Sequence, residues 1–229
     1  HCKLILTGRR HDRLESLARE LKNEFNVETH IIVQDITDVD QVKKDFDAIP
    51  EQFRAIDLLI NNAGLALGAE KFHEMPFDDA MRMIDTNNRG LIATTHAVLK
   101  GMVERHNGHI INIGSVAGTY PYPGANVYGA TKAFVNHFSL ALRADLKGQN
   151  VRVSSVEPGS IETEFSIVRF KGDTTKADNV YNNHRSLNAS HIADAVYWMA
   201  TLPAAMNVNR IEIMPTDQSF NGFSFDHGG

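Results

Sequence analysis

The chain has 229 residues, of which 42% are hydrophobic and 22% are charged, and this composition is typical of a globular domain. Its formal net charge of −5 argues against a nucleic-acid-binding protein, which would need a basic face. No apolar run approaches the roughly 20 residues that a membrane span needs. Cys2 is the single cysteine, as is typical of a reducing compartment. We therefore expect a cytoplasmic protein with one domain over residues 1–229, no membrane contact and no nucleic-acid partner.

Short apolar runs alternate with amphipathic stretches along the chain. The runs are rich in Ile, Leu and Val and predict strands buried on both faces, over residues 3–7, 29–34, 56–61, 109–114, 151–156 and 210–214. The stretches predict helices, over residues 12–25, 38–49, 77–105, 127–147 and 190–201. Asp38 and Ser190 are the expected N-caps of two of them. This alternation predicts an α/β protein with a doubly wound parallel sheet of the Rossmann type and helices on both faces.

One segment interrupts the alternation. Residues 165–188 are polar and poorly periodic, and they are long for a connection between two elements. In open parallel sheets, ligands bind beyond the carboxyl ends of the strands. We expect this segment to form a substrate lid over such a site.

Two arginines follow the first predicted strand, in Thr7-Gly8-Arg9-Arg10. Dinucleotide-binding folds that prefer NAD carry an acidic residue near this point, which accepts hydrogen bonds from the ribose 2′-OH. The sequence has no acid before this turn, and the forked guanidinium groups of Arg9 and Arg10 suit a 2′-phosphate. The motif favours NADP as the cofactor. Taken alone, it is equally consistent with a solvated arginine pair at the start of a helix.

Two further motifs follow predicted strands. Asn61-Asn62-Ala63-Gly64 places small and amide residues at a strand end, where a backbone can approach a cofactor closely. Pro158-Gly159-Ser160-Ile161-Glu162-Thr163 ends a later strand, and Thr163 could bond a carboxamide. The alternative for each motif is an ordinary turn, and for Asn61-Asn62-Ala63-Gly64 taken alone the ordinary turn is favoured.

Ser115 follows the strand over residues 109–114, and Tyr128 and Lys132 share one face of the next helix. Oxidation of an alcohol needs a base, and the tyrosine pKa near 10 is too high for that task at neutral pH. We expect the Lys132 ammonium to lower it by roughly 3 units, which corresponds to about 4 kcal/mol. Ser115 would then hold the substrate oxygen. The alternative is a buried tyrosine beside a lysine whose stem packs against apolar surface.

These motifs, together with Asn87-Asn88-Arg89-Gly90, resemble the short-chain dehydrogenase/reductase family in order and spacing over the whole chain. The resemblance implies that Tyr128 is the catalytic acid/base and that Lys132 lowers its pKa and binds the nicotinamide ribose. It implies that Ser115 positions the substrate oxygen and that Asn87 supports a water relay to Lys132.

The same resemblance implies a set of cofactor contacts. Asp35 and Ile36 would flank the adenine, and Asn62 would lie beside the adenosine ribose. The remaining implied cofactor residues are Ala63, Gly64, Pro158, Gly159, Ile161 and Thr163.

A closer similarity concerns NADP-dependent 3-hydroxy acid dehydrogenases, and it rests on residues 63–68, 85–88, 128–134 and 164–172. Such enzymes act on serine, allo-threonine and related 3-hydroxy acids, and they reduce malonic semialdehyde. A substrate of this class carries a carboxylate that needs a cation, and Arg169 in the expected lid is our candidate. The alternative is an ordinary surface arginine.

The sequence departs from the family at its beginning, where the family has a strand, a Gly-rich loop and a helix. This sequence begins at what resembles the second strand, so the first strand and the Gly-rich loop are absent from it. In the strand order 3-2-1-4-5-6 that strand is central. Residues 3–7 and 56–61 would then have no shared neighbour. We expect an N-terminal segment to complete the fold.

Three functions remain open on the sequence. The first is NADP-dependent oxidation of a 3-hydroxy acid, and the second is reduction of another carbonyl, such as a 3-oxoacyl, sugar or steroid compound. The third is a degenerate family member without catalysis. In all three we expect no metal site, because the histidines lack ligand spacing such as His-x-x-x-His. For the enzyme we expect a small-molecule substrate and a homo-oligomer, either a dimer or a tetramer, as the family implies.

Overall fold

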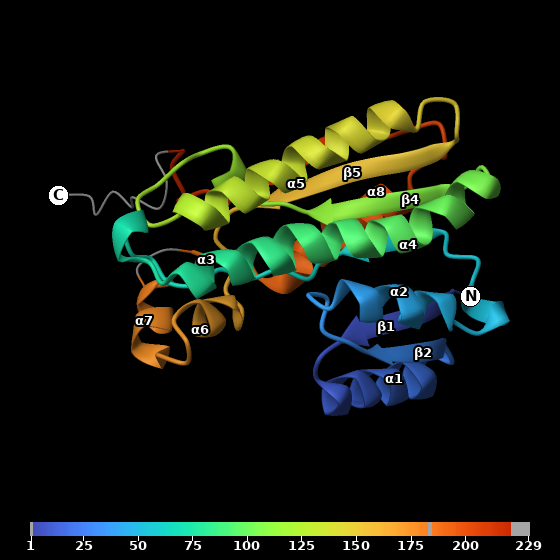
Figure 1. Ribbon diagram of the computed structural model, residues 1–229, viewed down its shortest axis with the longest axis horizontal. Coiled ribbons are helices and arrows are strands. Elements are labelled where there is room, and N and C mark those ends of the chain that lie inside the picture. The colour runs from blue at the N-terminus through green and yellow to red at the C-terminus, as the bar shows by residue number, and fades with distance from the viewer. Residues whose placement is uncertain (1, 183–184, 221–229) are drawn as a thin grey trace.

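Six parallel strands in the described part of the chain form two hydrogen-bonded groups. The computed structural model, shown in Figure 1, describes residues 2–182 and 185–220. In the first group, β1 (Lys3–Gly8) pairs with β2 (Glu28–Val33). The second group runs in the order β3 (Leu58–Asn61), β4 (Gly108–Ile113), β5 (Val151–Pro158) and β6 (Arg210–Ile213). All strand pairs are parallel, as the sequence predicts.

Helices follow the strands and cover both faces of the sheet, which confirms the predicted α/β architecture. The longer ones are α1 (His11–Phe25), α2 (Val39–Asp47), α3 (Phe77–Ile84), α4 (Leu91–Glu104), α5 (Asn126–Asp145) and α8 (Ala189–Thr201). In Figure 1, α4 and α5 lie in front of the four-stranded group and α8 lies behind it. Short 3₁₀ turns occur at Glu51–Phe53, Phe72–Glu74 and Val116–Gly118. None of the helices in residues 2–182 and 185–220 has the length and apolar character of a membrane-spanning helix.

The core lies on the two faces of β4 and β5. One cluster packs α4 and α5 against the sheet and contains Val98, Met102, Ile110, Leu142, Leu146, Val151 and Val153. A second packs α8 against the opposite face and contains Ile111, Val156, Ile192 and Met199. β4 and β5 are therefore buried on both faces, as predicted. The same prediction is wrong for β2 and β3, where Val33 is 48% and Ile60 is 43% exposed, because those strands have fewer neighbours.

β1 and β3 do not pair with each other in the described residues. This agrees with the expectation that these two strands lack a shared neighbour. The unit formed by β1, α1, β2 and α2 contacts the rest of the described chain through the packing of α2 on α4, through Ile36 beside Gly90 and through ion pairs with Glu164. In Figure 1 this unit occupies the lower right of the view.

A single helix was predicted over residues 77–105, and the structure differs from it at the centre. Between α3 and α4 lies a π-helical turn, η3 (Asp85–Gly90). Gly90 lets the loop after β2 approach this turn, because a Cβ at Gly90 would lie 2.6 Å from Ile36 Cγ1 and 2.9 Å from the Ile36 carbonyl oxygen. Single π turns inside α-helices occur frequently at functional sites.

Two local predictions concern helix N-caps. Asp38 is confirmed, since its side chain accepts a hydrogen bond from the Gln41 backbone N–H at 3.0 Å. Ser190 is wrong as the cap of α8, because Asn188 fills that position and forms a capping box with His191. The Ser190 hydroxyl instead donates to Asn188 Oδ1 at 2.6 Å.

The segment predicted to be a lid contains two short helices, α6 (Phe165–Arg169) and α7 (Thr174–Asn179). Ile161 and Leu187 form a parallel bridge at its base. The Leu187 carbonyl accepts from the Glu162 N–H at 2.8 Å, and the Leu187 N–H donates to the Ser160 carbonyl at 3.0 Å. Both ends of the lid are therefore tied together beside the end of β5.

Candidate active site

Ser115, Tyr128 and Lys132 converge at the carboxyl end of β4. Ser115 lies two residues beyond the strand and caps a 3₁₀ turn, with its Oγ accepting from the Ala117 N–H at 3.1 Å. Tyr128 and Lys132 lie in the first two turns of α5, and both are buried. Lys132 Nζ donates to the Ile113 carbonyl oxygen at 2.8 Å, at the last residue of the same strand. The three residues therefore meet as the sequence analysis expects.

The protonation of Tyr128 differs from the expectation. Burial is the largest influence and raises the pKa of Tyr128 above its usual value, while a hydrogen bond with Ser115 and the charge of Arg169 lower it. Burial also lowers the pKa of Lys132 to about 8. The Lys132 ammonium faces the Ile113 carbonyl and lies 6.0 Å from the centre of the Tyr128 ring. Because burial outweighs the influences that lower it, the pKa of Tyr128 lies above its usual value, and Tyr128 is a neutral phenol at pH 7.

Asn87 lies in the π turn and fixes the segment after β3. Its Oδ1 accepts from the Leu65 N–H at 2.8 Å, and its Nδ2 donates to the Leu65 carbonyl at 2.8 Å and to Thr131 Oγ1 at 2.9 Å. A Cβ at Gly64 would lie 3.4 Å from both Asn87 Oδ1 and Lys132 Nζ. The Asn87 side chain is thus committed to holding this turn, so any water relay to Lys132 would have to use the Asn87 backbone.

The other residues of the turn after β3 are accessible. Asn62 and Ala63 are exposed, whereas the preceding Asn61 is buried and donates to Thr95 Oγ1 and Asn112 Oδ1. Asn61 therefore holds the end of the strand, and its neighbours Asn62 and Ala63 are exposed beside Gly64. This is the arrangement expected of a turn that a cofactor approaches closely.

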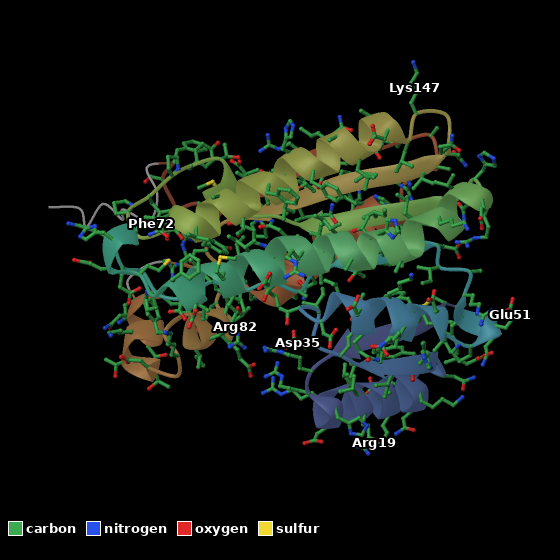
Figure 2. All side chains as sticks on the ribbon, in the orientation of Figure 1. Arg19, Asp35, Glu51, Phe72, Arg82 and Lys147 are labelled. Carbon is green, nitrogen blue, oxygen red and sulfur yellow. The ribbon has the colours of Figure 1, made fainter. Side chains whose placement is uncertain are left out.

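Asp35 and Ile36, which are predicted to flank the adenine, follow β2 and lie near the π turn. Hydrogen bonds from the Thr37 N–H at 3.0 Å and the Thr37 hydroxyl at 2.8 Å lower the pKa of Asp35, and the charges of Arg9 and Arg82 lower it further. Asp35 and Arg82 are both labelled in Figure 2. Ile36 packs against Gly90. The turn after β2 therefore lies near Arg9 of the turn after β1 and packs against the π turn.

The predicted carboxamide motif lies at the end of β5. Pro158 is buried, and Gly159 is tightly packed because a Cβ there would meet Gln218 Oε1 and lie 3.1 Å from Pro215 Cδ. Thr163 is exposed, and its Oγ1 accepts from the Phe165 N–H at 3.2 Å. Ile161 is held in the bridge at the base of the lid.

Two residues of the segment predicted to be a lid, Phe165 and Arg169, lie near Tyr128. The rings of Phe165 and Tyr128 lie with centroids 5.7 Å apart. Arg169 Nε donates to the Gly68 carbonyl at 2.8 Å, and its Nη1 lies 3.3 Å from the Tyr122 hydroxyl. The charge of Arg169 also lowers the pKa of Tyr128, so the predicted carboxylate ligand lies near this tyrosine.

The arginine pair after β1 lies apart from this centre, and its surroundings were not foreseen. Arg9 and Arg10 are exposed at the start of α1, and Arg10 forms an ion pair with Glu164, the residue before α6. Arg13 joins the same carboxylate. The sequence analysis missed Arg13 and Glu164. The spacing of three residues between Arg10 and Arg13 was the available signal, because it places both side chains on one helix face.

Comparison with known proteins agrees with this geometry. The model of the family described as short chain dehydrogenase matches residues 1–173. The chain is 55% identical over 223 residues to the NADP-dependent 3-hydroxy acid dehydrogenase YdfG of Salmonella typhi, covering 97% of this chain and 88% of that protein. It is 48% identical over 221 residues to the serine 3-dehydrogenase of Rhizobium radiobacter, covering 96% and 87% of the two chains.

Solved structures give the same result. The closed form of a serine dehydrogenase complexed with NADP+ matches with a TM-score of 0.90 and 51% identity, over 96% of this chain and 88% of the other. Serine dehydrogenase from Escherichia coli matches with a TM-score of 0.80 and 45% identity, over 95% and 88% of the two chains.

Proposed function

Because this chain belongs to the short-chain dehydrogenase family, we propose that it transfers a hydride between NADP(H) and a 3-hydroxy acid such as serine or allo-threonine. In the reverse direction it reduces 3-oxo acids of the malonic semialdehyde type. The observation that carries this proposal is the meeting of Ser115, Tyr128 and Lys132 at the end of β4, beneath a lid that brings Arg169 to the same place.

The chain's own residues supply the proton chemistry. Tyr128 is a neutral phenol beside Ser115, so it can donate its proton to a carbonyl oxygen that is being reduced. In the oxidation, Tyr128 must first lose its own proton to solvent, and the phenolate then takes the proton of the substrate hydroxyl. Ser115 holds the substrate oxygen through its hydroxyl. NADP, when bound, supplies the acceptor or donor of the hydride. Lys132, with a pKa lowered to about 8 by burial, keeps its ammonium at neutral pH for a ribose hydroxyl.

The residues present fit a dinucleotide. The exposure of Asn62 and Ala63 and the close packing of Gly64 on Asn87 and Lys132 support a cofactor that runs along the turn after β3. Asp35 and Ile36 would hold the adenine, and Arg9 and Arg10 the 2′-phosphate. The nicotinamide end of the cofactor would be flanked by Pro158, Gly159, Ile161 and Thr163.

Arg169 is the proposed ligand of the substrate carboxylate. Its guanidinium already contacts Gly68 and Tyr122, so it is held in one place by fixed partners. A pre-positioned guanidinium loses little freedom when it binds a carboxylate through two parallel hydrogen bonds.

The remaining proposals concern the assembly and its location. We propose a homo-oligomer, a dimer or a tetramer, because α4 and α5 carry apolar side chains that face solvent, among them Ile92 (41% exposed), Phe134 (39%) and Leu140 (38%). Light scattering coupled to size exclusion would measure its mass. A cytoplasmic location is supported by the free thiol of Cys2. Residues 1–229 would act as one catalytic domain, with residues 165–188 as its lid.

The test is a substrate panel with NADP and with NAD, run on the chain and on Tyr128→Phe. We expect oxidation of 3-hydroxy acids with NADP, and loss of turnover by about 1,000-fold or more in Tyr128→Phe with NADP binding retained. Turnover of neutral carbonyls alone would support the reductase alternative. Binding of neither cofactor would support a non-catalytic member and would contradict the proposal.

A further inference from the structure

Arg10 and Arg13 hold one carboxylate between them. Arg10 Nη1 donates to Glu164 Oε2 at 2.8 Å, and Arg13 Nη1 donates to the same oxygen at 3.0 Å. Arg13 Nη2 reaches the other oxygen, Glu164 Oε1, at 2.8 Å. The Arg13 pair is therefore bidentate, which is the geometry that a guanidinium also uses for phosphate.

This contact joins two parts of the chain that are far apart in sequence. Arg13 and Glu164 are separated by 151 residues. Glu164 is the N-cap residue of α6, directly after Thr163 and directly before Phe165, whose ring lies over Tyr128. The carboxylate thus connects the arginine end of α1 to the base of the lid.

Another anion could replace the Glu164 carboxylate as the partner of Arg10 and Arg13. The hydrogen bonds from Arg13 and Arg10 hold the pKa of Glu164 at about 2, so the carboxylate is ionised at every physiological pH. The side chains of Arg10, Arg13 and Glu164 remain 61%, 59% and 52% exposed. Exposed ion pairs contribute little net stability because water and salt screen them. An anion with more charge and more acceptor oxygens would compete effectively for the two guanidinium groups.

We propose that Arg13 acts with Arg10 as a specificity residue for the cofactor 2′-phosphate, and that Glu164 competes with this phosphate for both arginines. The inference rests on the proposed function, since it assigns one group of the proposed cofactor to this place. A cofactor without a 2′-phosphate leaves the Glu164 contact intact and gains nothing from the arginines. Glu164 therefore lowers the affinity for NADP and leaves the affinity for NAD unchanged.

The experiment uses a matched pair of probes, 2′,5′-ADP and 5′-AMP, which differ only in the 2′-phosphate. Their dissociation constants are measured by calorimetry, together with those of NADP and NAD, for the unmodified chain, Glu164→Gln and Arg13→Gln. Arg19→Gln is the control, because Arg19 is an exposed arginine on the same helix, as Figure 2 shows. Circular dichroism and melting temperatures establish that each variant folds.

We expect Glu164→Gln to bind 2′,5′-ADP and NADP roughly 3- to 10-fold more tightly, because a competing charge is removed. Arg13→Gln should weaken the binding of 2′,5′-ADP and of NADP by roughly 10-fold, as expected for a lost charge-assisted hydrogen bond. Neither change should alter binding of 5′-AMP or NAD, and Arg19→Gln should alter none of the four. In the double variant, the gain from Glu164→Gln should shrink, since the two residues act on each other.

The results separate this inference from the proposed function. If the unmodified chain binds NADP in preference to NAD but Glu164→Gln binds 2′,5′-ADP no more tightly, the competition is wrong and the function stands. Equal effects on 5′-AMP and 2′,5′-ADP would overturn the assignment of Arg13 and Glu164 to the phosphate. If no version of the chain binds NADP, the proposed function itself fails.

Discussion

The side chain of Asn87 holds the backbone of Leu65 by both of its polar groups, with 2.8 Å from Oδ1 to the Leu65 nitrogen and 2.8 Å from Nδ2 to the Leu65 oxygen. This contact connects the π turn to the segment that follows β3. Because Leu65 directly follows Gly64, the position of the proposed cofactor turn depends on one buried amide side chain.

Replacing Asn87 by Ala should therefore disturb both stability and cofactor binding. Each buried backbone group left without a partner costs about 1–3 kcal/mol, which urea unfolding would measure. We also expect weaker NADP binding, because the turn loses its anchor. Asn87→Asp keeps the acceptor for the Leu65 N–H, so it should lose less stability and less NADP affinity than Asn87→Ala.

Asn88→Ala is the control for that experiment. Asn88 is buried in the same π turn, but its Nδ2 donates to the Thr131 carbonyl at 3.0 Å and not to the cofactor turn. Asn88→Ala should lower the free energy of unfolding, but it should change the NADP dissociation constant less than Asn87→Ala does. Equal losses of NADP affinity in both variants would argue against a specific anchoring role for Asn87.

Arg169→Ala should raise the KM for 3-hydroxy acids far more than the KM for neutral alcohols. Loss of a charge-assisted hydrogen bond to the substrate carboxylate corresponds to roughly 10- to 100-fold in KM. Steady-state kinetics on both substrate classes measures the ratio, and Lys176→Ala on α7 controls for a general change in the lid. A similar rise in KM for both classes would assign Arg169 to holding Gly68 and Tyr122 in place and would remove it from the substrate site.

His109 should make the protein sensitive to acid. It is buried, its Nε2 lies 2.8 Å from Ser154 Oγ, and burial together with the charge of Arg152 lowers its pKa from 6.5 to about 4. Between these two values the unfolded chain binds a proton that the folded chain does not bind. The free energy of unfolding therefore falls as the pH decreases from about 6.5 to about 4, by about 3 kcal/mol from this group.

The measurement compares urea unfolding at pH 7 and pH 4 for the chain and for His109→Asn. The variant should lose about 3 kcal/mol less over this range, since the remaining groups titrate equally in both proteins. His96→Asn is the control, because His96 is exposed on α4. An unchanged pH dependence in His109→Asn would show that this histidine does not contribute.

The cap of α8 offers a test of a corrected prediction. Asn188 Oδ1 accepts from the His191 N–H at 3.2 Å, so Asn188→Ala should lower the free energy of unfolding by about 1 kcal/mol. Ser190→Ala should lower it by less, because Ser190 bonds only the cap side chain and no helix N–H. A larger loss in Ser190→Ala would restore Ser190 as the main stabilising residue of this terminus.

Local periodicity was sufficient to predict the six strands and the longer helices, but not α6, α7 or the break between α3 and α4. The motifs at the strand ends predicted the meeting of Ser115, Tyr128 and Lys132, because parallel strands end at one edge of a sheet. The direction of the Lys132 ammonium was not predictable, since it depends on the Ile113 carbonyl that the fold brings beneath it. The burial of a strand such as β2 or β3 depends on which strands lie beside it, and the periodicity of its own sequence does not show this.

Contacts between residues far apart in the chain could not be predicted from the sequence. Arg13 and Glu164 meet across 151 residues, and no local pattern connects them. The π turn was also not predicted. Asp85–Gly90 consists mostly of poor helix formers, but low helix propensity does not distinguish a π turn from an interrupted α-helix.

The π turn has a consequence for how this helix can vary. A π turn contains one residue more than the α-helical path it replaces, and α3 and α4 continue in line on either side of it, as Figure 1 shows. Deleting one residue there would restore the α-helical path, so that α3 and α4 stay in line but the turn that carries Asn87 is lost. Asn87 could then no longer face Leu65 and Thr131 together. Related proteins that keep this contact should exchange side chains along the helix freely on its exposed face, but they should not gain or lose a residue between its two halves.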